Sequence, residues 1–136
     1  LVNMGIVCSR QGKLEDALAM RNKAYRIYRK TIGLETMEVA LVLGGAGDVL
    51  HQQGKFEAAM GKFSEALAIH RRVVGDEHPE VADTLYSMAL CKSDAGDVAG
   101  AVVCLREAQS ILRKRGISHG LAEHVASFLA RLEGAM

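Results

Sequence analysis

The stretch Gln53-Gly54-Lys55-Phe56-Glu57 decides the fold, because the chain contains this pattern more than once. Residues 11–15 read Gln-Gly-Lys-Leu-Glu, so the step from position 11 to position 53 is 42 residues, and a second such step reaches Ala95-Gly96-Asp97-Val98. The columns identical in all three copies are Leu1/Leu43/Leu85, Gly12/Gly54/Gly96, Ala17/Ala59/Ala101, Ala24/Ala66/Ala108, Ile27/Ile69/Ile111 and Arg29/Arg71/Arg113. A fixed period of this length indicates stacked copies of one structural unit.

Each copy contains two helical patterns. In the second copy, apolar and small residues recur at steps of three and four between positions 39 and 50, and again between 56 and 73. Gly75 followed by Pro79, the one Pro of the chain, predicts the end of one helix and the start of the next. The predicted helices cover residues 1–11, 14–31, 37–52, 56–73, 79–95, 98–115 and 120–133. No segment alternates with period two, so no strand is expected.

Small residues occupy one column of the first helix of each copy, namely Gly5, Gly47 and Ala89. A Gly inside a helix costs about 0.5–1 kcal/mol relative to Ala. Its reuse therefore predicts that two helices approach closely at this point, which also explains why only 4% of the residues are aromatic.

These residues resemble the tetratricopeptide repeat family. The pattern is carried in the second copy by Leu43, Ala46, Gly47, Leu50, Gly54, Phe56, Ala59, Phe63 and Ala66. The 42-residue period and the segment from Val73-Val74-Gly75-Asp76 to His78-Pro79 are similar to the kinesin light chain type. The resemblance implies an all-α fold, a right-handed α-α superhelix of three helix pairs. The repeats would cover about residues 1–36, 37–78 and 79–119, in one domain. A HEAT-like array shares the period, but the Gly-Lys-aromatic turn and the spaced alanines disfavour it.

The segment 120–133 is interpreted as a C-terminal capping helix. Its stripe Leu121, Val125, Phe128, Leu129 and Leu132 matches the preceding first-type helix only at an offset of 40. Leu129 then stands where Gly47 and Ala89 stood, and its bulk would obstruct a close partner helix. Solenoids need such a cap. A truncated fourth repeat is the alternative, and the chain is expected to be a fragment of a longer protein.

Composition excludes several classes of function. Lys and Arg total 17 against 16 Asp and Glu, whereas coating a nucleic acid or an anionic membrane requires a basic excess. No apolar run approaches the roughly 18–20 residues of a membrane span. The odd set Cys8, Cys91 and Cys104 predicts reduced packing cysteines in a cytoplasmic protein. The five His residues show no metal-ligand spacing, and Gly44-Gly45-Ala46-Gly47 lacks the Lys-Ser/Thr of a phosphate loop. We expect no catalysis, metal or cofactor.

The resemblance implies that the first helix of each repeat lines a concave surface that binds a protein or peptide. Carried over column by column, the expected binding residues are Asn3, Gly44, Gly45, Asp48, His51, Gln52, Tyr86, Ser87 and Asp94. Of the asparagines that hold a peptide backbone in the family, only Asn3 is present. Gly44 and Gly45 are predicted to open a shallow floor between Asn3 and Tyr86 for a partner side chain or helix. The alternative interpretation is that these positions are ordinary helix residues that face the solvent.

Cations gather at the end of each second helix. This basic rim comprises Arg29, Lys30, Arg71, Arg72, Arg113, Lys114 and Arg115. Each cation near a helix C-terminus is favourable by about 0.3–1 kcal/mol, which explains the pattern without a partner. The rim could instead bind acidic protein segments, with nucleic acid a weaker alternative. A third possibility is a self-assembly element acting through Leu1 and Met4; the expected state is a monomer or a weak end-to-end assembly.

Overall fold

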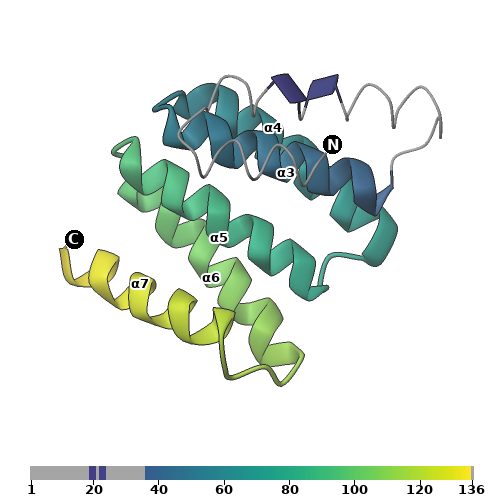
Figure 1. Ribbon diagram of the computed structural model, residues 1–136. Helices are drawn as coiled ribbons and strands as arrows, with labels where there is room; N and C mark the ends of the chain where they lie inside the picture. Colours follow the sequence, from purple (N-terminus) through teal and green to yellow (C-terminus); the bar gives the residue numbers. More distant parts are fainter. Residues whose placement is uncertain (1–18, 21, 24–35, 136) are drawn as a thin grey trace. The chain divides into compact units, whose positions relative to one another are not determined.

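The computed structural model describes residues 19–20, 22–23 and 36–135 (Figure 1). Within this part of the chain all regular structure is helical. The helices are α3 (Met37–Gln52), α4 (Phe56–Val74), α5 (Pro79–Asp94), α6 (Val98–Lys114) and α7 (Leu121–Ala135). The predicted all-α class is confirmed, and each predicted helix in this range ends within two residues of the observed one. The predicted helices 1–11 and 14–31 lie outside the described residues, apart from the helical residues 19–20 and 22–23.

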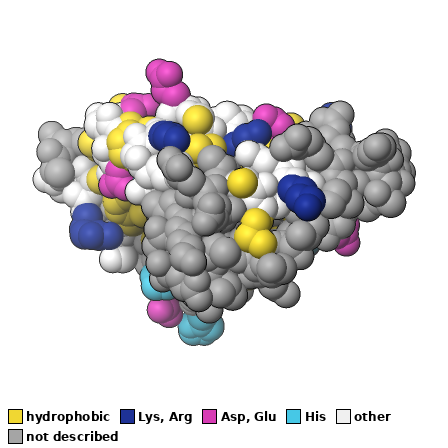
Figure 2. All heavy atoms as spheres, turned by 45° about the horizontal axis from the view of Figure 1, so that its top comes forward, with side chains coloured by type: hydrophobic (Ala, Val, Ile, Leu, Met, Phe, Trp, Pro, Cys, Tyr) yellow, Lys and Arg dark blue, Asp and Glu magenta, His cyan; other side chains and the backbone are white. Residues whose placement is uncertain are grey.

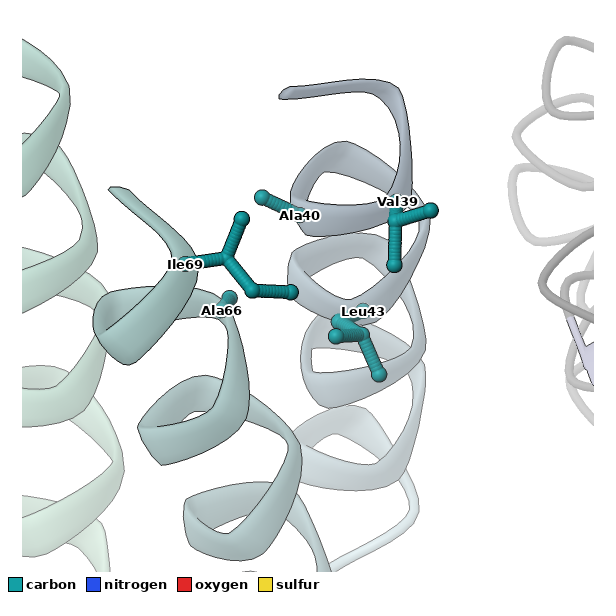
Figure 3. Packing of buried hydrophobic residues seen from close by; sticks show 5 residues of the cluster. All are labelled: Val39, Ala40, Leu43, Ala66 and Ile69. Carbon is teal, nitrogen blue, oxygen red and sulfur yellow. The ribbon is translucent and has the colours of Figure 1, made fainter. Parts of the chain in front are cut away.

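The chain divides into two compact units, Leu1–Ile69 and His70–Met136, each described by itself. In the first unit, α3 and α4 share a cluster of buried residues: Val39, Ala40, Leu43, Ala66 and Ile69. Figure 3 shows Ile69 extending from α4 toward Ala40 on α3. In the second unit, α6 packs against both α5 and α7. None of the described helices is long and apolar enough to cross a membrane.

The helix ends follow the repeated turn residues. Gly54 and Gly96 stand in one repeat column with φ of 77° and 93°, a left-handed conformation that an L side chain rarely adopts. Three of the described helices, α3, α5 and α6, begin with side-chain caps. Thr36 Oγ1 accepts from the Val39 amide at 3.4 Å, and Asp97 Oδ1 accepts from the Gly100 amide at 2.9 Å. At α5 the cap is His78, whose Nδ1 accepts from the Glu80 amide at 3.1 Å.

Gly47 lets the ring of Phe63 lie directly against α3. A Cβ atom built on Gly47 would stand 2.7–2.9 Å from three ring carbons of Phe63, closer than real contacts allow. Phe63 is 1% exposed, so its ring has little room to move aside. The third repeat places Ala89 and Leu105 in the same two columns, and both are fully buried. A larger residue on the first helix is thus matched by a smaller one on the second.

The second unit buries the apolar stripe of α7. Val125, Phe128, Leu129 and Leu132 are each at most 9% exposed. Leu129 is therefore covered although it stands in the column that holds Gly47 and Ala89. Because α7 packs on α6, this bulky stripe is buried by helices already present in the unit.

His70 is a polar residue in an otherwise apolar column. It is 6% exposed, its Nδ1 has no hydrogen-bond partner, and the equivalent residue one repeat later is the buried Leu112. Burial lowers the pKa of His70 below its ordinary value of 6.5. The carboxylates of Glu80 and Asp83 oppose this shift, and His78 adds to it. Burial in turn raises the pKa of Asp83. The folded chain therefore favours neutral His70.

We expect Gly47→Ala to lower the free energy of unfolding by about 1–3 kcal/mol, because the new methyl group collides with Phe63. Gly44→Ala is the matched control in the same helix, since a Cβ there meets nothing within 4 Å. It should be stabilising by about 0.5–1 kcal/mol. Urea unfolding measures both. The double variant Gly47→Ala/Phe63→Leu, which copies Ala89 and Leu105, should cost less than its two single changes combined. Equal stabilities of the two alanine variants would contradict the close contact.

Stability should fall as the pH is lowered from about 7.5 to about 5. The unfolded chain binds a proton at position 70 below the ordinary pKa of 6.5, whereas the folded chain resists it. The unfolded state thus holds more protons in this window. His70→Leu, which copies Leu112, should make the fall shallower, and Leu112→His should make it steeper. Urea unfolding over a pH series measures these slopes. A His70→Leu slope equal to that of the wild type would show that another group causes the effect.

Candidate protein-interaction surface

On α3, the residues predicted to line the binding surface (called the groove positions) differ in burial from the residues that form the core. Leu43, Ala46 and Leu50 are between 1% and 6% exposed. Between them, Gly44, Gly45 and His51 are half-buried, while Asp48 and Gln52 are exposed. This separation follows from the helical period, which places the core residues on one side and leaves the remaining positions for contacts outside it.

The backbone of α3 has space beside it at Gly44. A Cβ atom at Gly44 would have nothing within 4 Å, in contrast to the crowded Gly47 one turn later. At the end of the same helix, the His51 ring lies 5.8 Å from the ring of Phe56, tilted by 60°. This face of α3 therefore passes from open backbone at Gly44 to polar side chains near its C-terminus.

On α5 the predicted residues divide by exposure. Tyr86 and Ser87 are half-buried and Asp94 is exposed. The Tyr86 ring meets Phe128 of α7 edge to face, with centroids 6.2 Å apart and planes at 80°. The Arg131 guanidinium lies over the Phe128 ring, 5.3 Å from its centroid. We call Tyr86, Phe128 and Arg131 the aromatic cluster. Such contacts each contribute on the order of 0.5–1.5 kcal/mol.

Sequence reasoning missed this cluster as a unit. Phe128 was assigned to the apolar stripe of α7, and Arg131 was given no role. The signal was present, since Phe128 and Arg131 are three apart and so lie on one helix face. What the repeat pattern could not supply was the contact with Tyr86, because α7 follows an offset of 40 rather than 42 from α5.

The structure places the predicted residues in two groups. Gly44, Gly45, Asp48, His51 and Gln52 lie on α3 in the first unit, and Tyr86, Ser87 and Asp94 lie on α5 in the second. Asn3 is outside the described residues. Within each unit the members share one helix, so each helix offers its own stretch of candidate surface.

Several rim cations pair with carboxylates of the chain itself. Arg71 Nη2 donates to Glu107 Oε2 at 2.8 Å, and its Nη1 lies 3.6 Å from Asp76 Oδ1. Lys114 Nζ donates to Glu77 Oε1 at 2.7 Å, and Arg115 Nε donates to the Glu77 carbonyl at 2.8 Å. The hydrogen bond from Lys114 is the main reason why the pKa of Glu77 is lowered.

The remaining rim residues are exposed or lie outside the described residues. Arg72 and Arg113 are exposed in the last turns of α4 and α6, whereas Arg29 and Lys30 are outside the described residues. Figure 2 shows cationic and anionic side chains interspersed over the visible described face. The described rim is therefore partly neutralised by its own carboxylates.

The cysteines and histidines do not gather into a site within residues 36–135. Cys91 and Cys104 are buried thiols, and burial raises the pKa of each. In this described part of the chain, no three His, Cys, Asp or Glu residues are placed to hold a metal ion. The predicted packing role fits the burial of these two cysteines; Cys8 lies outside the described residues.

Comparison with known proteins adds to this geometry. Residues 1–67 match the family model described as Tetratricopeptide repeat. A search of curated protein sequences gives no match. A Podosopora anserina structure described as kinesin light chain nearly identical TPR-like repeats has a TM-score of 0.85 at 20% identity. That alignment covers 96% of this chain and 63% of the other, so this chain spans less than two thirds of that relative.

Two further structures share the fold. BtubC (BKLC) from P. vanneervenii has a TM-score of 0.74 at 20% identity, with 98% of this chain and 61% of that one covered. The N-terminal domain of stress-induced protein-1 from C. elegans has a TM-score of 0.72 at 15% identity, with coverages of 96% and 90%. At such identities the likeness concerns the fold. Residues 1–67 thus match the tetratricopeptide repeat family, and the fold of the chain is similar to that of the kinesin light chain repeat structure.

Proposed function

We propose that the chain is a non-catalytic interaction module that binds a helical or peptide segment of another protein through the predicted binding positions that α3 and α5 each carry within their own unit. The observation that carries this proposal is the open backbone at Gly44, where a side chain would meet nothing. Tetratricopeptide repeat domains typically bind proteins or peptides and are generally not enzymes. The burial of Cys91 and Cys104 among apolar residues is in keeping with a reducing compartment such as the cytoplasm.

A helical segment suits this surface better than a fully extended peptide. An extended peptide needs side-chain amides along the groove to satisfy its backbone, and in the groove columns of α3 and α5 only Gln52 carries one. A helix satisfies its own backbone and offers side chains instead. In the first unit the open backbone at Gly44 provides space for such side chains, and in the second unit the half-buried Tyr86 provides an aromatic contact.

Known neighbours support a protein partner without naming it. The SycD structure from Yersinia enterocolitica is described as a type III secretion translocator chaperone, and it shares the fold at a TM-score of 0.71 and 18% identity. The basic rim is the weaker candidate for binding, because Arg71, Lys114 and Arg115 already contact acidic partners or carbonyls within the chain.

We further propose that α7 closes the stack and that the repeats extend over residues 1–36, 37–78 and 79–119. Two repeat positions that are buried in α3 and α5 are occupied by exposed polar residues in α7. Val49 and Cys91 are at most 1% exposed, whereas Arg131, at the offset of 40, is exposed. The column of Val42 and Thr84 likewise leads to the exposed His124. These substitutions disfavour stacking of a further helix on this side.

Substitutions at the predicted binding positions of α3 and α5 should weaken the binding of selected helical peptides. Peptides are selected from a displayed library of amphipathic helices on the wild-type chain, and their Kd is measured by isothermal titration calorimetry. Gly45→Arg and Tyr86→Ala together should raise Kd at least about tenfold, because a bulky cation fills the floor and an aromatic contact is lost.

Matched controls lie on outward surfaces. Gly61→Arg introduces the same side chain at an exposed position of α4 where a Cβ meets nothing, and Val103→Ala truncates the 66% exposed Val103 of α6. Both should leave Kd unchanged. Peptides that bind the groove variant as tightly as the wild type would refute the assignment. Mass that rises with concentration in sedimentation, together with no selected binders, would favour self-assembly instead.

A further inference from the structure

The loops that follow α4 and α6 differ in charge at equivalent positions. After α4 the chain reads Gly75-Asp76-Glu77-His78, and Asp76 and Glu77 both contact cations. One repeat later, positions 118 and 119 hold Ser118 and His119. The cations are nevertheless retained, as Arg113-Lys114-Arg115. The second loop therefore keeps the basic residues and lacks the acids.

The first loop provides a template for what an anion at position 118 would contact. Arg71 lies 3.6 Å from Asp76, five residues further along the chain. Arg113 occupies the column of Arg71, and Ser118 occupies the column of Asp76, so the five-residue spacing is the same. Arg71 is held by Glu107 as well, whereas the exposed Arg113 has no ion pair within the described residues.

Ser118 is accessible to another protein. Ser118 and His119 are exposed and lie between the end of α6 and the start of α7, outside any helix. Arg115, three residues before Ser118, and Arg113, five residues before, are exposed as well. Arg113 lies in the last turn of α6, where helices fray readily. Two arginines upstream of an exposed serine suit an acidic substrate cleft.

We propose that Ser118 is a phosphorylation site for an arginine-directed protein kinase. The γ-phosphoryl group of a nucleoside triphosphate moves to Ser118 Oγ as its bond to the β-phosphate breaks. The hydroxyl proton passes to the base of the kinase, and nucleoside diphosphate leaves. Arg113 and Arg115 direct the kinase, and Arg113 afterwards pairs with the phosphate as Arg71 pairs with Asp76. This proposal is independent of binding at the groove.

The consequence is a change of charge at one end of the basic rim. A phosphoserine carries about −1.5 to −2 charges at neutral pH, which is enough to offset Arg113 and much of its surroundings. It also places an anion shortly before α7, where negative charge is favourable. Phosphorylation would thus tie the loop to α6 in the way that Asp76 and Glu77 tie the preceding loop.

The test uses the whole chain, an arginine-directed kinase and Mg-ATP, with incorporation followed by intact mass and the site mapped by peptide fragmentation. Wild type should gain one phosphoryl group at Ser118, and Ser118→Ala should gain none there. Arg113→Gln/Arg115→Gln should slow the initial rate about tenfold or more. Ser110→Ala is the control, because Ser110 is exposed but has no arginine three or five residues upstream. Modification of the arginine variant at the wild-type rate would overturn the proposal.

A thermal unfolding measurement tests the ion pair separately. Phosphorylated wild type should melt about 1–3 °C higher than the unmodified chain, as expected for one exposed charged pair. The shift should disappear in Arg113→Gln, phosphorylated with enough kinase to reach completion, and should shrink at high salt. An equal shift in Arg113→Gln would show that Arg113 is not the partner.

Discussion

The contact between Gly47 and Phe63 sets the geometry on which the described repeat depends. Since a Cβ atom has no room at position 47, the two helices of the pair are held as close as backbone and ring allow. Close helices leave narrow interior columns, which Ala46, Ala59 and Ala66 fill at 2% exposure or less. The chain contains few aromatic residues because such closely packed helices leave little room for large side chains between them.

The same constraint explains why two repeats with different residues share one fold. The pair Gly47 and Phe63 is replaced by Ala89 and Leu105 in the third repeat, so bulk moves from one helix to the other while the sum stays similar. Interiors tolerate such exchanges when volume is conserved. This exchange of volume does not extend to α7, because Leu129 places a large side chain at the position that Gly47 and Ala89 occupy in α3 and α5.

The helices were predictable because each boundary has a local chemical cause. Gly54 and Gly96 adopt left-handed backbone, and Pro79 starts α5, so the predicted ranges agree with the structure within two residues. The side-chain partners were less predictable. Neither the His78 cap nor the contacts of Glu77 follow from helical periodicity, because both depend on how loops fold back. The groove positions were predicted by column, and α3 and α5 carry them at exposed or half-buried sites.

The ion pairs of the rim connect residues that are almost one repeat apart. Arg71 and Glu107 are separated by 36 residues, and Glu77 and Lys114 by 37. Each pair therefore draws one partner from one repeat and the other from its neighbour. These charges belong to the junction rather than to the repeat. During evolution, a repeat that is duplicated, deleted or exchanged would bring half of each pair with it. Its neighbours must supply the complementary half, and this limits which repeats can follow one another.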